Sequence, residues 1–251
     1  MPVIRLDSSY KPKADLLKGR TILITGAGDG IGKQLALSAA AHGANLVLLG
    51  RTQAKLEAVY DQIESTTPSK PIICPIDLET LDDEQAKEIA EAIQAEFGVL
   101  DGLVHNAAIL GQRTPIQSYS TAAWQSVMQI NVNAGFILSK ALIPLMSESA
   151  DARMLFTSSG VGRTGIAYWG AYSVSKFAIE GLAQLLADEL TETTNIRVNA
   201  VNPGGTRTSM RATAFPAENP AGVKSAEDLM SGYLYLLGPD SRAISGQSID
   251  I

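Results

Sequence analysis

Short apolar runs alternate with longer stretches of mixed polarity along most of this chain. Apolar runs with little charge are typical of strands that are buried on both faces of a parallel sheet. The runs of this kind, each a predicted strand, lie at residues 21–25, 45–49, 71–76, 100–105, 153–157 and 196–201. The stretches between them have helical sequences, and the predicted helices span residues 33–41, 53–64, 82–97, 121–146 and 171–192. In the last of these, apolar residues from Ala178 to Leu190 keep a period near 3.6, as expected of a helix with one buried face.

The regular alternation of strand and helix predicts the fold class. Such a chain forms α/β structure with a parallel sheet covered by helices on both faces. Right-handed crossovers make the sheet doubly wound, as in a Rossmann fold. No repeat, low-complexity tract or linker divides the sequence, so we expect a single domain over residues 1–251. Within it we expect residues 1–18 to form a polar N-terminal arm with a short helical turn at 14–17, and residues from about 209 to 224 to form a lid over a substrate.

Composition and charge narrow the functional classes. The chain has 251 residues, of which 45% are hydrophobic and 18% charged, as in an ordinary globular protein. A net charge of −6 argues against nucleic acid and against an anionic membrane surface as partners. One cysteine excludes an intrachain disulfide, and two histidines are too few for a zinc site, so no metal is expected, although carboxylates alone could hold one. No signal segment or membrane-spanning run is visible, so we expect a cytoplasmic protein.

A glycine-rich turn follows the first predicted strand. Its sequence, Thr25-Gly26-Ala-Gly-Asp-Gly30-Ile31-Gly32, stands between a strand and a helix. Glycines let the backbone approach a pyrophosphate, and a helix N-terminus offers free N–H groups to it. The turn lacks the spacing of the G-x-G-x-x-G fingerprint, and Gln34 stands where a P-loop requires Ser or Thr. The context therefore predicts a nucleotide site that is not an NTPase loop.

A cation follows the second predicted strand, in the segment Gly50-Arg51. A dinucleotide-binding fold usually has an acid here, which hydrogen-bonds the ribose 2′-hydroxyl of NAD. An acid would repel a 2′-phosphate, whereas an arginine pairs with it. We therefore expect NADP, or its reduced form NADPH, as the cofactor rather than NAD. The alternative is that Arg51 is an ordinary solvated loop residue.

A phenol and an amine lie four residues apart, at Tyr172 and Lys176, in a predicted helix. At this spacing both side chains leave one face of the helix, a turn apart. A free tyrosine titrates near about 10, but a nearby ammonium favours the phenolate and lowers the pKa. We expect Lys176 to lower the pKa of Tyr172 toward the range that suits general acid–base catalysis. Ser159 offers a hydroxyl for the reacting oxygen, although a Tyr-x-x-x-Lys pair also arises by chance on surface helices.

Glycine, proline and polar residues follow the ends of five predicted strands. In open α/β sheets, ligands bind at the carboxyl ends of the strands. The residues in this position are Gly26, Asp77, Asn106, Ser159 and Pro203. Their shared position predicts one site at this edge of the sheet, so the motifs support one another.

In combination, these motifs resemble the short-chain dehydrogenase/reductase family over residues 18–250. Besides the glycine turn, the matches include Asn106-Ala107, Asn131 in an Ile-Asn-Val tract, and Ser159, which precedes Tyr172 by thirteen residues. Residues 202–208 are similar to a bacterial subgroup of oxidoreductases with unassigned substrate. The resemblance implies a sheet of seven strands in the order 3-2-1-4-5-6-7. It also implies a cofactor held by Gly26, Asp29, Gly30, Ile31, Arg51, Asp77, Leu78, Asn106, Tyr172, Lys176, Pro203, Gly204, Thr206 and Thr208.

The resemblance further implies an NADP-dependent oxidoreductase that transfers a hydride between the nicotinamide and a carbonyl or secondary alcohol. Tyr172 would be the general acid or base, and Lys176 would lower its pKa and bind the nicotinamide ribose. Ser159 would hold the substrate oxygen, and Asn131 would position a water that connects Lys176 to solvent. The partners implied are a small-molecule substrate and further copies of the chain, in a homodimer or homotetramer built on the two long helices. The alternatives are an NADP(H)-binding redox sensor without turnover and a lyase or epimerase that retains its cofactor.

The sequence departs from the family pattern at three positions. Ala108 replaces a usual glycine, and Asp29 replaces a basic residue that is common in NADP-preferring members, which leaves Arg51 to hold a 2′-phosphate nearly alone. The chain stops at Ile251 without the usual Asp-Gly-Gly ending, which bears on the tetramer. The expected walls of the substrate pocket are Ile166, Trp169 and residues 110–115.

Overall fold

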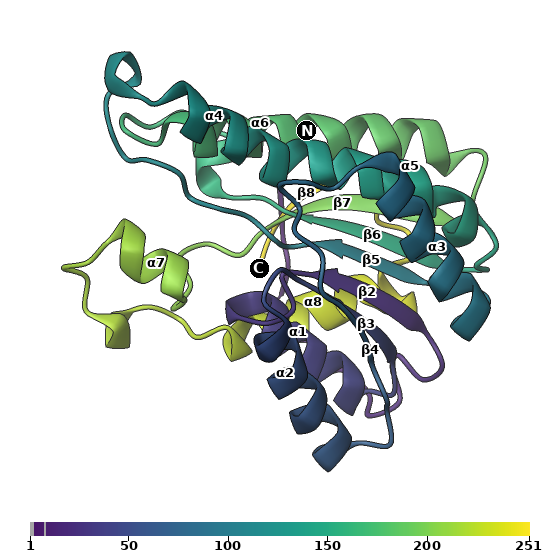
Figure 1. Ribbon diagram of the computed structural model, residues 1–251. Helices are drawn as coiled ribbons and strands as arrows, with labels where there is room; N and C mark the ends of the chain where they lie inside the picture. The colour runs from purple at the N-terminus through teal and green to yellow at the C-terminus, as the bar shows by residue number, and fades with distance from the viewer. Residues whose placement is uncertain (1–2, 8) are drawn as a thin grey trace.

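The chain folds around one parallel β-sheet. The computed structural model describes residues 3–7 and 9–251. Within them, eight strands are hydrogen-bonded in the order β1-β8-β7-β6-β5-β2-β3-β4, and all neighbouring strands are parallel (Figure 1). The strands are β1 (Val3–Arg5), β2 (Thr21–Thr25), β3 (Asn45–Leu49), β4 (Ile72–Cys74), β5 (Gly102–His105), β6 (Ala152–Thr157), β7 (Ile196–Asn202) and β8 (Ser248–Asp250). The doubly wound α/β prediction is confirmed, because β2 to β8 follow the expected order of seven strands.

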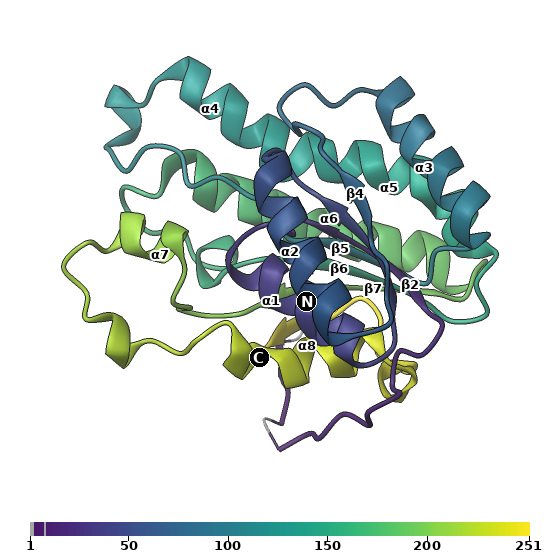
Figure 2. The ribbon, with the colours of Figure 1, turned by 60° about the horizontal axis from the view of Figure 1, so that its bottom comes forward.

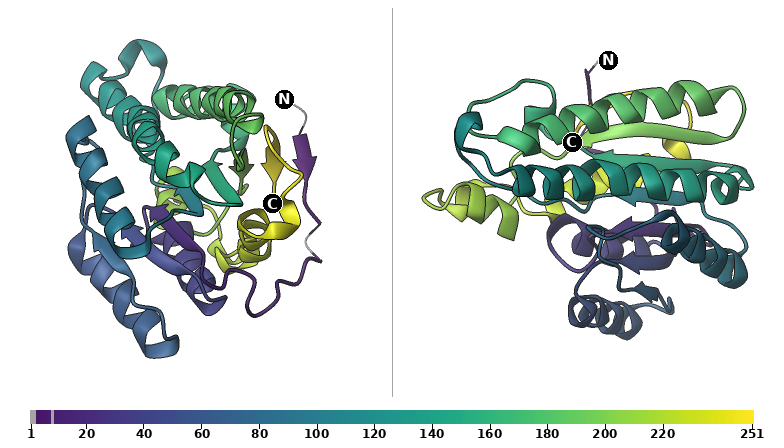
Figure 3. Two further views of the ribbon diagram at one scale, coloured as in Figure 1. Left: turned by 90° about the vertical axis from the view of Figure 1, so that its right-hand side faces the viewer. Right: turned by 45° about the horizontal axis from the view of Figure 1, so that its top comes forward.

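The additional strand, β1, lies where we expected only a polar arm. Residues Val3–Arg5 pair with the last strand, and Val3 lies opposite Ser248. Figure 3 (left) shows β1 beside β8 at the edge of the sheet. The short helical turn expected at residues 14–17 is instead a run of turns, which buries Leu17 completely.

Helices cover both faces of the sheet. The α3, α5 and α6 helices pack on one face, and α1, α2 and α8 pack on the other (Figure 2). Adjacent residues of β2 face opposite sides, because Leu23 joins the first core while Ile22 and Ile24 join the second. This two-sided burial explains why the strands are continuous apolar runs in the sequence. The helices are α1 (Gly30–Ala41), α2 (Gln53–Thr66), α3 (Asp83–Phe97), α4 (Thr121–Met128), α5 (Ala134–Ser147), α6 (Gly170–Thr191), α7 (Ser209–Ala214) and α8 (Met230–Leu237).

Local chemistry sets the ends of α3. The Asp82 carboxylate accepts from the Gln85 N–H at 2.9 Å, and the Gln85 amide oxygen accepts from the Asp82 N–H at 3.3 Å. This capping box satisfies two of the free N–H groups at the helix start. Gly98, with a φ of 75°, ends the helix in the left-handed conformation that glycine adopts at low cost.

The predicted helix over residues 121–146 is interrupted. A single π-helical segment, Gln129–Asn133, separates α4 from α5 and contains Asn131. Such segments inside α-helices are rare and frequently mark functional sites. By length and hydropathy alone Thr121–Ser147 could also cross a membrane, but 50% of its apolar window is buried in this fold, as in the core helix of a globular protein.

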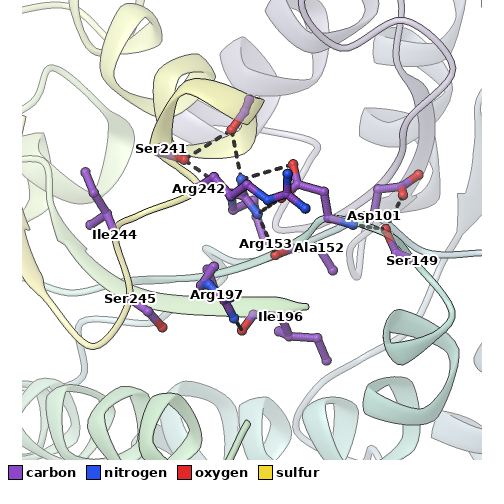
Figure 4. A network of polar contacts seen from close by, with 12 residues as sticks. Asp101, Ser149, Ala152, Arg153, Ile196, Arg197, Ser241, Arg242, Ile244 and Ser245 are labelled. Atoms are coloured by element: carbon purple, nitrogen blue, oxygen red, sulfur yellow. Dashed lines mark hydrogen bonds and ion pairs between the residues drawn. The ribbon is translucent and has the colours of Figure 1, made fainter. Parts of the chain in front are cut away.

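A buried arginine anchors the amino end of the sheet (Figure 4). Arg153, in β6, has no exposed surface. Its Nη1 and Nη2 donate to the two carboxylate oxygens of Asp151 at 2.8 and 3.0 Å. Its Nε donates to Ser241 Oγ at 3.2 Å, and Nη2 also donates to the Gly238 carbonyl at 3.3 Å. The Arg20 Nη1 lies 3.3 Å and the Arg242 Nε 3.6 Å from the same carboxylate, so Asp151 pairs with three guanidinium groups and joins β6 to the segment after α8.

Candidate active site

The carboxyl ends of the strands open into one cleft of ≈ 470 Å³, a typical volume for a ligand site. Asp77 and Leu78 line an adjoining pocket of ≈ 190 Å³, which shares Gly26, Asp29 and Arg51 with the cleft. The predicted residues that line the cleft itself are Gly26, Asp29, Gly30, Ile31, Arg51, Asn106, Ser159, Tyr172, Lys176, Pro203, Gly204, Thr206 and Thr208. Of the predicted site residues, only Asn131 lies behind the cleft, beside a small internal cavity.

The glycine turn leaves no room for side chains. Gly26 has a φ of 69°, a conformation that favours glycine. A Cβ on Gly32 would lie 2.3 Å from the Gly26 carbonyl oxygen. Thr25 joins the turn to the next strand, because its Oγ1 accepts from the N–H groups of Asn106 and Ala107, each at 3.0 Å. Because the turn has no bulky side chains, the N-terminus of α1 is open to the cleft. This arrangement fits a pyrophosphate bound at a helix N-terminus.

A buried hydroxyl also fits a ligand in this cleft. Ser158 lines the cleft directly after β6 and is 2% exposed. Its Oγ has no hydrogen-bond partner among the residues that the structure describes. Because buried hydroxyls are nearly always paired, this one indicates a bound molecule that supplies the partner. Together with the tight glycine turn at Gly26 and Gly32, this hydroxyl fits a bound dinucleotide. Ser158 is thus a candidate contact, although the thirteen-residue spacing to Tyr172 had selected Ser159.

Tyr172 and Lys176 lie in the first turns of α6 and share a face of the helix, as predicted, since both line the cleft. Burial disfavours the phenolate and raises the pKa of Tyr172 to about 12, while a hydrogen bond from Ser159 acts in the opposite direction. Burial also lowers the pKa of Lys176 to about 8. The expected lowering of the Tyr172 pKa is therefore wrong for this structure, because desolvation outweighs the effect of the neighbouring ammonium.

The position of the lysine explains this result. Lys176 Nζ donates to the Thr157 carbonyl at 2.7 Å and lies 5.4 Å from the centroid of the Tyr172 ring. The ammonium is thus bound to the end of β6 instead of to the phenol oxygen. The Tyr172 phenol is protonated at neutral pH, the form that a general acid requires, while its raised pKa makes the proton harder to donate than that of a free tyrosine.

Asn131 holds the loop that follows β5. Its Oδ1 accepts from the Ile109 N–H at 2.8 Å, and its Nδ2 donates to the Ile109 carbonyl and to Ser175 Oγ, each at 3.0 Å. Behind Lys176 lies a cavity of ≈ 10 Å³, which borders on Asn131, Lys176 and His105. This is about the space of one water molecule. The cavity suits the expected water between Asn131 and Lys176, while the amide of Asn131 is already occupied by Ile109 and Ser175.

His105 faces the same cavity as a buried imidazole. Its ring stacks on Phe156 with centroids 4.5 Å apart, and Nε2 lies 2.9 Å from Ser139 Oγ. Burial lowers the pKa of His105 from 6.5 to about 3. Between these values the unfolded chain takes up a proton that the folded chain excludes, so folding stability is lost as the pH falls.

We expect His105 to remove about 1.4 kcal/mol from the free energy of unfolding for each pH unit below its ordinary pKa. Denaturant titrations of wild type and His105→Gln over a series of pH values measure this contribution. The variant is expected to be less stable at neutral pH and to have the shallower pH dependence. Parallel pH curves for the two proteins would contradict the buried, neutral imidazole.

The family is decided by sequence comparison. Residues 20–219 match the sequence model described as short chain dehydrogenase. The chain belongs to the short chain dehydrogenase family. The oxidoreductase YciK of Escherichia coli (strain K12) is 48% identical over 241 residues, which cover 96% of this chain and 95% of that protein. This confirms the resemblance that the motifs indicated and makes the chain an oxidoreductase of this family.

Solved structures of short chain dehydrogenases share the fold. One from Pseudomonas syringae has a TM-score of 0.95 and 53% sequence identity, and the match covers 96% of this chain and 98% of that one. Another, from Shigella flexneri 2a and complexed with NADP, has a TM-score of 0.93 and 48% identity, with 95% and 99% of the two chains covered.

In this short chain dehydrogenase, a second cation that no sequence motif indicated, the ammonium of Lys55, lies near Arg51. Lys55, in α2, lines the adjoining pocket beside Arg51 and Thr52. Its Nζ lies 2.7 Å from Asp29 Oδ2, and Asp29 also caps α1 by accepting from the Gly30 N–H at 2.7 Å. Arg51 is therefore not the only cation in this pocket, because Asp29 holds Lys55 beside it. The pattern gave no sign of this pair, because only folding brings the glycine turn against α2.

The segment predicted as a lid forms a closed lobe beyond the cleft. A backbone bridge between Thr206 and Lys224 joins its two ends. The short helix α7 projects from the body of the molecule (Figures 1 and 2). Among the predicted walls, Trp169 lines the cleft, whereas Ile166 does not line it and is 53% exposed. Ser209, Met210, Arg211 and Ala214 of the lobe line the cleft, so the lobe borders the site, and its action as a lid stays a prediction.

Proposed function

We propose that this short chain dehydrogenase transfers a hydride between NADP and a carbonyl or secondary alcohol group. The observation that carries the proposal is that the Tyr172 phenol lies on the wall of a cleft that also contains Ser159, Lys176 and the glycine turn. NADPH, when bound, supplies the hydride. The residues that would hold it are Gly26, Asp29, Gly30, Ile31, Arg51, Asp77, Leu78, Asn106, Lys176, Pro203, Gly204, Thr206 and Thr208.

The side chains would divide the remaining work. Tyr172 donates its proton to the carbonyl oxygen during reduction and accepts it back during alcohol oxidation. Ser159 hydrogen-bonds the same oxygen and so stabilises the charge that develops there. Lys176 can pass a proton toward the cavity behind it, where one water can lie between Lys176 and the loop that Asn131 holds.

Two cations favour NADP over NAD. Arg51 and Lys55 both line the pocket that adjoins the glycine turn, and a 2′-phosphate would pair with cations there. The Shigella flexneri relative, which is complexed with NADP, supports this preference.

We expect Arg51→Ala to raise the Kd for NADP+ by about 10- to 100-fold, the loss typical of a hydrogen bond to a charged group. The Kd for NAD+ should change little, because NAD+ lacks the phosphate. Lys55→Ala should act in the same direction but more weakly, since Asp29 competes for its ammonium. Calorimetric titration measures the constants, and Arg242→Ala, at the amino end of the sheet, is the matched control. Equal affinities of the wild type for NADP+ and NAD+ would overturn the preference.

The activity itself is tested by following NADPH absorbance with a panel of aldehydes, ketones, diketones and quinones. Turnover of any member establishes a carbonyl reductase and gives a first substrate class. Tight NADPH binding without turnover of any member would instead favour a redox sensor.

A second copy of the chain is the partner that we propose for the surface of α5 and α6. Four large apolar side chains are exposed there, namely Phe136, Val174, Phe177 and Leu185. Exposed apolar side chains gathered on one surface commonly mark an interface. The expected assembly is a homodimer through these helices, which sedimentation of the wild type and Phe177→Glu would test.

A further inference from the structure

One arginine at the substrate end of the cleft has no carboxylate partner. Arg113, in the loop after β5, donates through Nη1 to the Ala214 carbonyl. Its guanidinium carbon lies 4.5 Å from the centroid of the Trp169 ring and 5.0 Å from that of Phe215. Arg113 is exposed and does not itself line the cleft, but Trp169 and Ala214 do, so two aromatic rings and one carbonyl hold Arg113 beside the cleft wall.

Two other charged side chains around the cleft are already paired. Arg211 lines the wall, but its Nε and Nη2 donate to the two oxygens of Glu218 at 2.7 and 2.6 Å. Asp29, the acidic side chain that lines the cleft, is paired with Lys55 near the glycine turn. Across residues 3–7 and 9–251, Arg113 forms no ion pair. Arg113 therefore adds an unpaired positive charge beside Trp169, apart from Lys176 next to Tyr172 and Arg51 at the cofactor end.

A guanidinium in this setting is prepared to receive an anion. It has five N–H donors, of which the Ala214 carbonyl uses one. The ring faces fix its plane, so little side-chain freedom remains to be lost on binding. Arginine pairs with carboxylates through two parallel hydrogen bonds, which gives direction as well as charge.

The position relative to the reacting group limits the substrate. The Trp169 ring contacts both groups, with its centroid 5.7 Å from the centroid of the Tyr172 ring and 4.5 Å from the Arg113 guanidinium carbon. A carbonyl at Tyr172 and an anion at Arg113 can therefore belong to one small molecule. The Trp169 face and the apolar Leu110 and Met210 suit an apolar body between them.

We propose that Arg113 is a specificity-determining residue and that the substrate is an oxo compound with a carboxylate group about one six-membered ring away from its carbonyl. This assignment rests on the proposed reductase function. The alternative role for Arg113 is a latch between the loop after β5 and the lid, in which case it would affect all substrates alike.

The test compares matched pairs of substrates, in which one member is negatively charged and the other is neutral. Each pair contains a carboxylate and its methyl ester, built on an aromatic aldehyde, a cyclohexanone and a short oxo acid. The wild type is expected to show a kcat/KM at least about tenfold higher for the carboxylate of the best pair, as a charge-assisted bidentate contact gives. Arg113→Met is expected to remove this preference and to leave the ester within about threefold of its original value. Arg113→Lys should retain part of the preference, because it keeps the charge but not the fork.

Two controls keep the inference separate from the proposed function. Arg207→Met removes an exposed positive charge from the lid region without touching the cleft wall, and it should leave the preference intact. Binding of benzoate to the protein saturated with NADP+ needs no turnover, and calorimetry is expected to show that Arg113→Met weakens it at least about tenfold.

The possible outcomes distinguish the assignment of Arg113 from the reductase function. Turnover of esters and carboxylates at equal rates, or an equal loss for both in Arg113→Met, would overturn the assignment of Arg113 while leaving the reductase in place. Absence of turnover with every compound, together with benzoate binding that depends on Arg113, would overturn the reductase function and leave the anion site. Absence of benzoate binding to the wild type would overturn the anion site itself.

Discussion

Tyr172→Phe is expected to lower kcat for carbonyl reduction by about 10² to 10⁴, the usual contribution of a positioned general acid. The replacement removes only the hydroxyl, which is the group that donates the proton. Burial keeps the pKa of this hydroxyl at about 12, so the wild-type residue is protonated throughout the neutral range. The Kd for NADPH should change little, because the aromatic ring and its packing remain.

The measurement is a steady-state assay with a substrate found in the panel, combined with NADPH titration of both proteins. Tyr168→Phe serves as the matched control, since Tyr168 is near in sequence but 57% exposed and does not line the cleft. Its kcat should equal that of the wild type. Full turnover by Tyr172→Phe would mean that another group donates the proton, and the role of Tyr172 would have to be abandoned.

Asp151→Ala is expected to lower the free energy of unfolding by about 3 to 5 kcal/mol, the range found when one member of a buried ion pair is removed. Asp151 is the carboxylate to which both Nη atoms of the fully buried Arg153 donate. It also lies 3.3 Å from Arg20 and 3.6 Å from Arg242, so its loss leaves three guanidinium groups without this carboxylate at the amino end of the sheet. Activity should survive at temperatures where the variant is folded, because the cleft lies at the opposite end of the strands.

Urea denaturation at neutral pH measures this loss. Asp188→Ala, which removes a carboxylate from an exposed position of α6, is the control and should change stability by no more than about 0.5 kcal/mol. Combining Asp151→Ala with Arg153→Met should recover part of the loss, because the uncompensated charge disappears with the arginine. A loss below about 1 kcal/mol in Asp151→Ala would show that the ion pairs of Asp151 contribute little to stability, as is usual for pairs screened by solvent.

The alternation of apolar runs and helical stretches predicted a doubly wound parallel sheet, because right-handed crossovers leave few possible arrangements. The order of its seven strands was implied by the resemblance to the short-chain dehydrogenase/reductase family, and β2 to β8 follow it. The strand β1 has no such signal. It is short, Val3 and Arg5 are both exposed, and its partner lies at the other end of the sequence. The π-helical segment around Asn131 was equally hidden, because its sequence keeps an apolar helical character on both sides.

The site divides in the same way. Residues that belong to local motifs, such as the glycine turn and the Tyr172–Lys176 pair, were found because spacing along the chain determines their spacing in the structure. Lys55 was missed, and Arg113 was named only as part of the expected wall at residues 110–115, because the contacts of both side chains join segments that are distant in the sequence. The pKa of Tyr172 was predicted in the wrong direction for a related reason. A sequence shows which charges are neighbours along a helix, but the burial of the Tyr172 phenol depends on which segments pack around it in the fold.

The strand Val3–Arg5 pairs with Ser248–Asp250, a segment far away in the sequence. During translation the central strands can pair while the side of β7 that β8 will cover remains open. Unpaired strand edges of this kind template association with other chains. Synthesis of β8 therefore closes this side of β7, and a nascent chain stalled before Ser248 would leave that strand edge free to associate.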